Sequence, residues 1–428
     1  MTKTILILGG IGEDRTRCLL PFLLSPAGPS PAFVRIVDKH LLLPQVGAYT
    51  TYVDVDARAA LKEGVASGVV EYVQGNLLTE ATRTKVFTLP NAHGGPSQGF
   101  STVFDFTGEH DFELPEAVHV ERTLRLALLL GQTAVANNVG VYLRGISTLY
   151  KLAGGKKGKV GGTDGVSEPW GVRAGWYHEA ARGLAQIKGL RLILLRPGLM
   201  YGPFTLTGIT PRCLIGEVYK YEGEKLEFLW AESLAQNTVH AHDFSSAAVA
   251  IAAWASTKTA EELVQIAGEE LPTTLKSNDL VKGITGAAKK EDSVTAAVFN
   301  IVDDCSTTQA EIAKVIAEVV GVESGFHGSI ISTFAKMNFG DVIEDVNDKH
   351  LEGWSALLTQ SNPPISSTLP ISPHTAADVL QPYPIDFSGE KLHRLVGWKP
   401  EYKLTPQVVR DTVEGFRKEG NWPNATPK

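Results

Sequence analysis

The stretch Ile5–Arg15 reads ILILGGIGEDR and decides the fold. Its first four apolar residues predict a buried strand, its glycines a tight turn, and the apolar spacing of Thr16 to Leu24 a helix behind the turn. Such a turn offers free backbone N–H groups and the positive end of a helix dipole, which suit a pyrophosphate. Taken alone, the pattern fits nucleotide binding and an ordinary strand-to-helix turn about equally.

The turn departs from the usual dinucleotide-binding pattern at its third glycine position, which Arg15 occupies. A glycine there normally lets the helix pack closely against the strand. Glu13 and Asp14 suit the positive end of the helix dipole, but they would repel phosphates if they faced a ligand. Because the chain has a net charge of −7 and no broad basic surface, a dinucleotide must be held by local backbone N–H groups, with Arg15 as a candidate cation.

Asp38 follows the second apolar run, about 26 residues after Gly12. A carboxylate about 20 residues after the glycines binds the ribose diol of NAD in dinucleotide-binding folds. The negative charge would repel a 2′-phosphate and so favours NAD, whereas Lys39 and Arg15 leave NADP open. The alternative interpretation of Asp38 is a simple loop carboxylate after a strand.

Further apolar runs alternate with helical patterns along the first half of the chain. The predicted helices are 114–137 and 176–186, and the predicted strands after the first are 33–37, 69–73, 103–106, 140–143 and 190–195. Strands that are largely apolar and separated by helices predict a parallel sheet covered on both faces, hence an α/β fold.

The second half of the chain is less regular. Asp243 suits the N-cap of a helix over 244–254, and 298–302 is strand-like. Thr307 or Thr308 is expected to cap a helix over 309–320 that stops at Gly321.

Composition narrows the class of protein. The 428 residues allow about two to three domains, and 43% hydrophobic residues supply an ordinary globular core. The acidic balance excludes a general nucleic-acid or anionic-membrane surface. Cys18, Cys213 and Cys305 have neither disulfide nor zinc spacing, so we expect no metal and a reducing compartment. No signal-peptide pattern or bilayer-length apolar run is present, so a cytoplasmic protein without membrane contact is expected.

Seven stretches together carry a family resemblance. They are 5–12, Asp38, Gly75-Asn76-Leu77, 194–203 (LLRPGLMYGP), 239–243 (VHAHD), 299–301 and 392–400 (LHRLVGWKP). Through them the chain resembles the extended short-chain dehydrogenase/reductase family of NAD-dependent sugar epimerases and dehydratases. The resemblance implies a Rossmann-like doubly wound parallel sheet with a smaller, interleaved C-terminal α/β lobe.

The resemblance also implies a domain division and a cofactor site. Residues 1–203 would form the NAD(P)-binding domain, with 239–256 and 298–304 packing onto it, and 204–428 would mainly form the substrate-binding lobe. The expected cofactor is NAD or NADP, with NAD favoured by Asp38. The implied cofactor-binding residues are Gly9, Gly10, Ile11 and Gly12 at the pyrophosphate, Asp38 at the adenosine ribose, Asn76 and Leu77 at the adenine, Thr107 and Gly108 at the inner ribose, and Pro197.

The catalytic residues of the family are matched only in part. The family uses a Ser or Thr after the fifth strand, for which Ser147 is the candidate, and a Tyr-x-x-x-Lys pair on the next helix. Tyr177 is followed four residues later by Ala181, so the lysine that would lower the pKa of a tyrosine is missing. His178 is the alternative proton carrier, because imidazole titrates near neutrality.

Four hypotheses remain open from the sequence. The first is an NAD(P)-dependent oxidoreductase or epimerase with a rewired proton donor, acting on a secondary alcohol or ketone of a polar, nucleotide-sugar-like small molecule. The second is a catalytically silent dinucleotide-binding sensor or scaffold. The third is a related fold that has lost the cofactor or changed its reaction, and the fourth is an interaction protein that uses 325–374. Homodimers are common in the family, and the composition neither supports nor excludes one.

Overall fold

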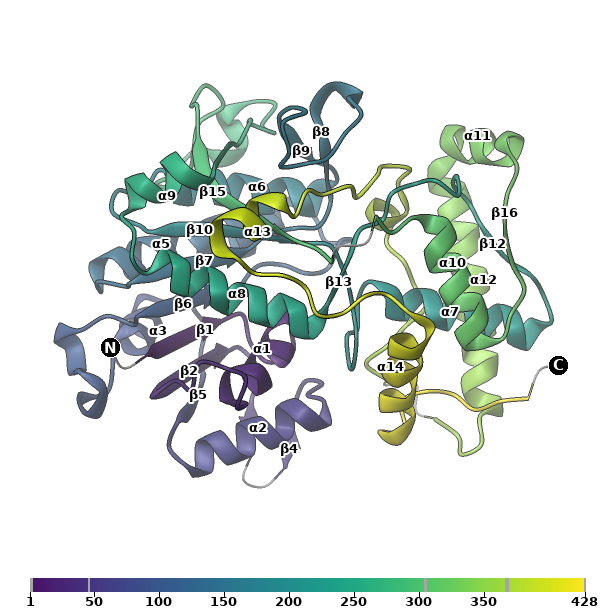
Figure 1. The fold of residues 1–428 in the computed structure, drawn as a ribbon, viewed down its shortest axis with the longest axis horizontal. Helices are drawn as coiled ribbons and strands as arrows, with labels where there is room; N and C mark the ends of the chain where they lie inside the picture. Colours follow the sequence, from purple (N-terminus) through teal and green to yellow (C-terminus); the bar gives the residue numbers. More distant parts are fainter. Residues whose placement is uncertain (1–2, 45–46, 304–305, 366–368, 427–428) are drawn as a thin grey trace. The chain divides into compact units, whose positions relative to one another are not determined.

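The computed structural model describes residues 3–44, 47–303, 306–365 and 369–426 (Figure 1). Cys305 lies outside these residues. The chain divides into two compact units. Unit 1 comprises Met1–Pro197, His242–Ile301 and Phe387–Pro400, and unit 2 comprises Gly198–Ala241, Val302–Asp386 and Glu401–Lys428.

Unit 1 is built on a mostly parallel sheet, which confirms the predicted α/β class. Within the described residues the sheet has eight strands in the order β14-β15-β10-β7-β6-β1-β2-β5. In sequence order they are β1 (Thr4–Leu8), β2 (Phe33–Asp38), β5 (Val70–Gln74), β6 (Thr102–Asp105), β7 (Val141–Gly145), β10 (Leu192–Pro197), β14 (Gly268–Glu270) and β15 (Thr295–Ile301). Only β14 pairs antiparallel among them. The order reverses at β1, which lies between β2 and β6.

Helices cover both faces of this sheet (Figure 1). The helices of unit 1 include α1 (Asp14–Leu24), α2 (Val55–Ala66), α3 (Glu80–Phe87), α5 (Leu126–Ala136), α6 (Val172–Ala185), α8 (Ala241–Ala255), α9 (Ala260–Ala267) and α13 (Glu390–Val396). Successive strand residues face opposite sides. Phe106, just after β6, therefore contacts Phe244 of α8, whereas Asp105 pairs with Arg144, whose guanidinium lies over the ring of Tyr177 in α6.

Three helices predicted from the sequence can be compared with the structure. Helix α8 begins at Ala241, so Asp243 lies inside its first turn and not at the N-cap as predicted. Helix α10 (Gln309–Val320) begins and ends as predicted, because Thr308 and Glu311 form a capping box and Gly321 adopts a left-handed conformation. The helix predicted over 114–137 consists of α4 (Glu116–His119), a π-helical turn (Val120–Arg125) and α5.

Unit 2 is mainly helical. It contains the parallel pairs β11 (Leu199–Tyr201) with β13 (Thr238–His240) and β12 (Leu226–Phe228) with β16 (Ser324–Phe326), and the helices α7 (Ile209–Glu222), α10, α11 (Ser329–Met337), α12 (Phe339–Gln360) and α14 (Pro406–Lys418). Ile331, Phe334 and Met337 of α11 are exposed. An exposed apolar face in this segment is what the interaction-protein hypothesis predicts.

The described residues give two negative findings. No described helix is both long and apolar enough to cross a bilayer. In the same part of the chain, no group of three or more His, Cys, Asp or Glu side chains is arranged to hold a metal ion.

Candidate functional site

The glycine turn after β1 is packed too closely for side chains. Gly9 and Gly10 have φ of +115° and +81°, in the left-handed region that favours glycine. A Cβ on Gly9 would lie 2.6 Å from the backbone carbonyl carbon of Phe106, and one on Gly10 would collide with the carboxylate of Asp38. Ile11 is fully buried and anchors the turn in the core. The turn therefore touches the carboxyl ends of both β2 and β6, on either side of β1.

Asp38, the last residue of β2, carries an unpaired buried oxygen. Its Oδ1 accepts a hydrogen bond from the backbone N–H of His40 at 3.3 Å. Its Oδ2 has no hydrogen-bond partner among the described residues. This oxygen is also shielded from water, because the whole residue is only 7% exposed. Burial raises the pKa of Asp38. An unsatisfied buried acceptor is costly, so this oxygen is suited to receive a donor from a ligand such as a ribose diol.

Asn76 and Leu77 lie beyond the same edge of the sheet. Asp38 pairs with Gln74 across β2 and β5, which places Asn76 two residues beyond that pair. The side chain of Asn76 accepts a hydrogen bond from the N–H of Leu78 at 3.0 Å and shapes the turn, while Leu77 is buried. The structure thus brings together Gly9, Gly10 and Asp38, with Asn76 close along the edge.

On the other side of β1, a buried ionic network holds the end of β6. Asp105 and Arg144 form an ion pair in which both side chains are fully buried. The carboxylate of Asp105 also accepts hydrogen bonds from Tyr142 Oη at 2.7 Å and from Thr107 Oγ1 at 2.7 Å. Because Arg144 Nη2 further donates to the carbonyl oxygen of Thr107 at 3.1 Å, Thr107 is fixed inside the network.

Gly108 leaves room for the phenol of Tyr177. Gly108 has a φ of +141°, and a Cβ at this position would collide with Tyr177 Oη. Burial raises the pKa of Tyr177, although Arg173 and Arg15 act in the opposite direction. No lysine lies one turn further along α6, where Ala181 stands. At neutral pH the side chain is therefore a protonated phenol, which can donate a proton but does not act as a base.

His110 joins Tyr177 to a charged cluster, formed by Glu13, Arg15 and Arg173, that the sequence did not reveal. Its Nδ1 lies 3.4 Å from Tyr177 Oη, 3.4 Å from Arg173 Nη2 and 3.5 Å from Glu13 Oε2. Arg15 Nε lies 3.2 Å from Glu13 Oε1. Partial burial lowers the pKa of His110, so the imidazole is neutral near pH 7. The only sequence signal was the position of His110, two residues after Gly108 in the loop that follows β6.

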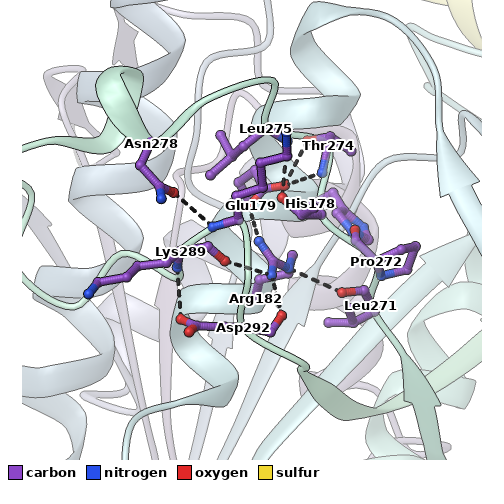
Figure 2. Close-up of polar contacts among 12 residues, drawn as sticks. His178, Glu179, Arg182, Leu271, Pro272, Thr274, Leu275, Asn278, Lys289 and Asp292 are labelled. Carbon is purple, nitrogen blue, oxygen red and sulfur yellow. Dashed lines mark hydrogen bonds and ion pairs between the residues drawn. The ribbon is translucent and has the colours of Figure 1, made fainter.

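His178 does not join this cluster. Its Nε2 lies 2.6 Å from the carbonyl oxygen of Pro272 (Figure 2). Its Nδ1 lies 3.1 Å from Tyr150 Oη. A carbonyl oxygen can only accept, so Nε2 carries the hydrogen and Nδ1 accepts from the phenol. Burial lowers the pKa of His178 to about 4. With both nitrogens engaged, His178 has no free atom for the proton transfer that the sequence led us to expect.

The next polar residues of α6 hold the same segment. Glu179 Oε1 accepts hydrogen bonds from the backbone N–H and hydroxyl of Thr274, at 2.6 and 2.7 Å (Figure 2). Arg182 pairs with Glu179 at 2.7 Å and donates to the carbonyl oxygens of Leu271 and Asp292 at 3.1 and 2.8 Å. This face of α6 therefore binds the chain that connects β14 to β15.

The last two predicted site residues lie at other strand ends. Ser147 follows β7 and is buried, and its Oγ accepts a hydrogen bond from the backbone N–H of Leu149 at 3.1 Å. Pro197 is the last residue of β10 and pairs with Ile301 of β15. Ser147 thus has a local partner, and Pro197 closes its strand.

The comparison with solved structures found proteins similar to this chain. No protein-family model and no curated protein matches the sequence. The enzyme WbmG of Bordetella bronchiseptica, solved with NAD and UDP, is 13% identical, with a TM-score of 0.56 over 98% of this chain and 95% of that one. The dTDP-glucose 4,6-dehydratase DesIV of Streptomyces venezuelae, solved with NAD, is 16% identical, with a TM-score of 0.57 over 98% of both chains.

A third neighbour adds an epimerase. The UDP-glucose 4-epimerase of Thermotoga maritima, solved with UDP-glucose, is 15% identical, with a TM-score of 0.53 over 97% of this chain and 99% of that one. Two of the three neighbours described are thus sugar-nucleotide enzymes by name, a dTDP-glucose 4,6-dehydratase and a UDP-glucose 4-epimerase. At such identities the likeness establishes the fold, and at that level the predicted resemblance is confirmed.

Proposed function

We propose that unit 1 binds NAD along the carboxyl edge of its sheet, and that the protein is an NAD-dependent oxidoreductase or epimerase. The observation that carries the proposal is the unpaired Oδ2 of Asp38, buried against Gly10 at the end of β2. A dinucleotide crosses a doubly wound sheet where the strand order reverses, which is at β1 here. The residues present fit the adenosine half of NAD: the glycine turn leads into the N-terminus of α1, where a pyrophosphate can bind, and Asp38 can accept the ribose hydroxyls.

Asp38 favours NAD over NADP. A 2′-phosphate on the ribose would approach the carboxylate of Asp38 directly, and like charges in a buried site repel strongly. Lys39, the nearest cation in sequence, lowers the pKa of Asp38, but burial outweighs it and the pKa is raised.

In the proposed reaction Tyr177 transfers the proton. Bound NAD would supply the hydride acceptor for oxidation of a secondary alcohol. In the reductive direction, the neutral phenol of Tyr177 is suited to give its proton to the substrate oxygen; in the oxidative direction, the proton of the substrate hydroxyl would pass through this phenol to neutral His110, whose Nδ1 lies 3.4 Å from Tyr177 Oη. The Asp105–Arg144 network holds the loop that carries Gly108 against this phenol. The nucleotides bound by the structural neighbours support a nucleotide-sugar substrate, and we assign unit 2 as the substrate-binding lobe.

Calorimetric titration with NAD, NADH, NADP and NADPH tests cofactor binding. We expect NAD and NADH to bind more tightly than the two phosphorylated forms. Turnover is then followed at the absorbance band of reduced nicotinamide with a panel of sugar nucleotides. Tyr177→Phe should abolish turnover and leave NAD affinity unchanged, whereas Tyr150→Phe, which removes another buried hydroxyl, should keep activity. Full turnover in Tyr177→Phe would refute the assigned proton donor.

A second candidate is a dinucleotide-binding protein without redox activity. The observation in its favour is that Tyr177 lacks a lysine one turn away and that burial raises its pKa. This candidate predicts that NAD binds and that no sugar nucleotide changes the nicotinamide absorbance of the bound cofactor.

A further inference from the structure

The side chain of Arg15 reaches across the carboxyl ends of two strands. Arg15 is the second residue of α1, and its side chain is 9% exposed. Its guanidinium carbon lies 5.7 Å from the centroid of the Phe106 ring, just after β6. Its Nη1 lies where a Cβ on Gly145, the last residue of β7, would stand. Glycine at 145 therefore gives the guanidinium the space that it occupies over β6 and β7.

The guanidinium of Arg15 has an unused donor. Its Nε pairs with Glu13 at 3.2 Å, but its Nη1 is buried and has no hydrogen-bond partner among the described residues. A guanidinium can only donate, and a buried charged donor without an acceptor is strongly unfavourable. Nη1 thus requires an acceptor that the described part of the chain does not provide.

Arg173 adds a second cation without a carboxylate of its own. Its Nε donates to the backbone carbonyl of Glu109 at 3.3 Å, and its Nη2 faces His110. Its guanidinium carbon lies 5.0 Å from the centroid of the Tyr177 ring. Within the described residues no carboxylate oxygen lies within ion-pairing distance of Arg173. Arg15 and Arg173 thus have only the carboxylate of Glu13 between them, which leaves one positive charge in excess.

We propose that Arg15 and Arg173 form a receptor for an acidic group, a carboxylate or a phosphate, on the substrate whose reacting oxygen meets Tyr177. Guanidinium groups bind both acids through paired N–H donors. His110, which contacts Arg173, has a side chain that is 37% exposed. The inference rests on the proposed function for the role of Tyr177. It assigns the acid to the substrate because the guanidinium carbon of Arg173 lies 5.0 Å from the centroid of the Tyr177 ring, and the proposed function places the Tyr177 phenol at the substrate oxygen.

The test uses two simple acids as probes, malonate and inorganic phosphate. Thermal unfolding of the full chain is measured with saturating NAD, in each probe and in chloride at equal ionic strength. We expect malonate or phosphate to raise the midpoint more than chloride does. Arg15→Gln and Arg173→Gln should each abolish the difference. Arg122→Gln, at an exposed arginine paired with Glu109, should preserve it.

Two further variants keep the test decisive if Arg15→Gln unfolds unit 1. Gly145→Ala retains the positive charge but displaces the guanidinium, so the probe effect should fall. Glu13→Gln removes the competing carboxylate, so the affinity for the probe should rise about tenfold, as a lost buried charge pair implies. A purely structural cluster would be destabilised by Glu13→Gln without any gain in probe affinity.

Three results would overturn the inference: an effect of the probes no larger than that of chloride, an unchanged probe affinity in Glu13→Gln, or competition between the probes and NAD. Competition would assign the cations to the cofactor phosphates. Calorimetry separates this failure from failure of the proposed function. If NAD does not bind but the Arg15-dependent probe effect persists, the cofactor proposal fails and the anion site stands.

Discussion

The protonation of His178 offers a quantitative test of the site assignment. Its pKa is lowered by burial from 6.5 to about 4. Between pH 6.5 and pH 4 the imidazole is protonated in the unfolded chain but neutral in the folded chain. The free energy of unfolding therefore falls as the pH falls from 6.5 to 4. For one such group the linkage relation gives a loss of about 2 kcal/mol between pH 8 and pH 5, and about 3 kcal/mol by pH 4.

Urea unfolding of wild type and His178→Gln, followed by circular dichroism at pH 8, 7, 6 and 5, measures this loss. Glutamine does not titrate, so the fall in unfolding free energy between pH 8 and pH 5 should be smaller by about 2 kcal/mol in the variant. His350 in unit 2 is the matched comparison, because burial also lowers its pKa to about 4. His350→Gln should leave the His178 contribution intact. An identical pH dependence in wild type and His178→Gln would refute the structural assignment of His178.

Two substitutions test the packing at the strand ends on the two sides of β1. Asp105→Asn leaves Arg144 without its charge partner and should lower the unfolding free energy by about 3–5 kcal/mol in urea titrations; a loss below about 1 kcal/mol would contradict a buried pair. Gly10→Ala should abolish NAD binding in calorimetry, because the new methyl group collides with the carboxylate at the end of β2. Gly68→Ala is its control, since Gly68 has a similar φ of +77° but no atom within 4 Å of the added carbon. Equal NAD affinity in both glycine variants would contradict the close packing of the turn.

Most of the sheet of unit 1 could be predicted because its strands are local apolar runs, whereas β14 (Gly268–Glu270) was missed because it has no apolar side chain. Segments such as 5–8 and 33–37 are buried on both faces, so their composition alone indicates a covered parallel sheet. Capping chemistry likewise placed α10, through Thr308 and Gly321. The position of Asp38 at a strand end was also visible, because the strand and the residue that follows it are adjacent in sequence.

The charged cluster could not be predicted, because its members meet only through the fold. Glu13 and Arg15 come from α1, His110 from the loop after β6, and Arg173 from α6. In sequence Arg15 looks like a departure from a glycine pattern, and nothing shows that Gly145 makes room for it. The surroundings of His178 could not be predicted for the same reason. Its partners Tyr150 and Pro272 are 28 and 94 residues away, so its burial and hydrogen bonds were invisible.

The NAD affinity of Asp38→Asn, measured by calorimetry beside wild type, tests the central claim most directly. Asparagine preserves the shape of the side chain but replaces one acceptor oxygen with an amide that donates. If Asp38 accepts the ribose hydroxyls, NAD affinity should fall about tenfold to a hundredfold, as the loss of a charge-assisted hydrogen bond implies. Unchanged NAD affinity in Asp38→Asn, or no NAD binding by the wild-type protein, would contradict the account.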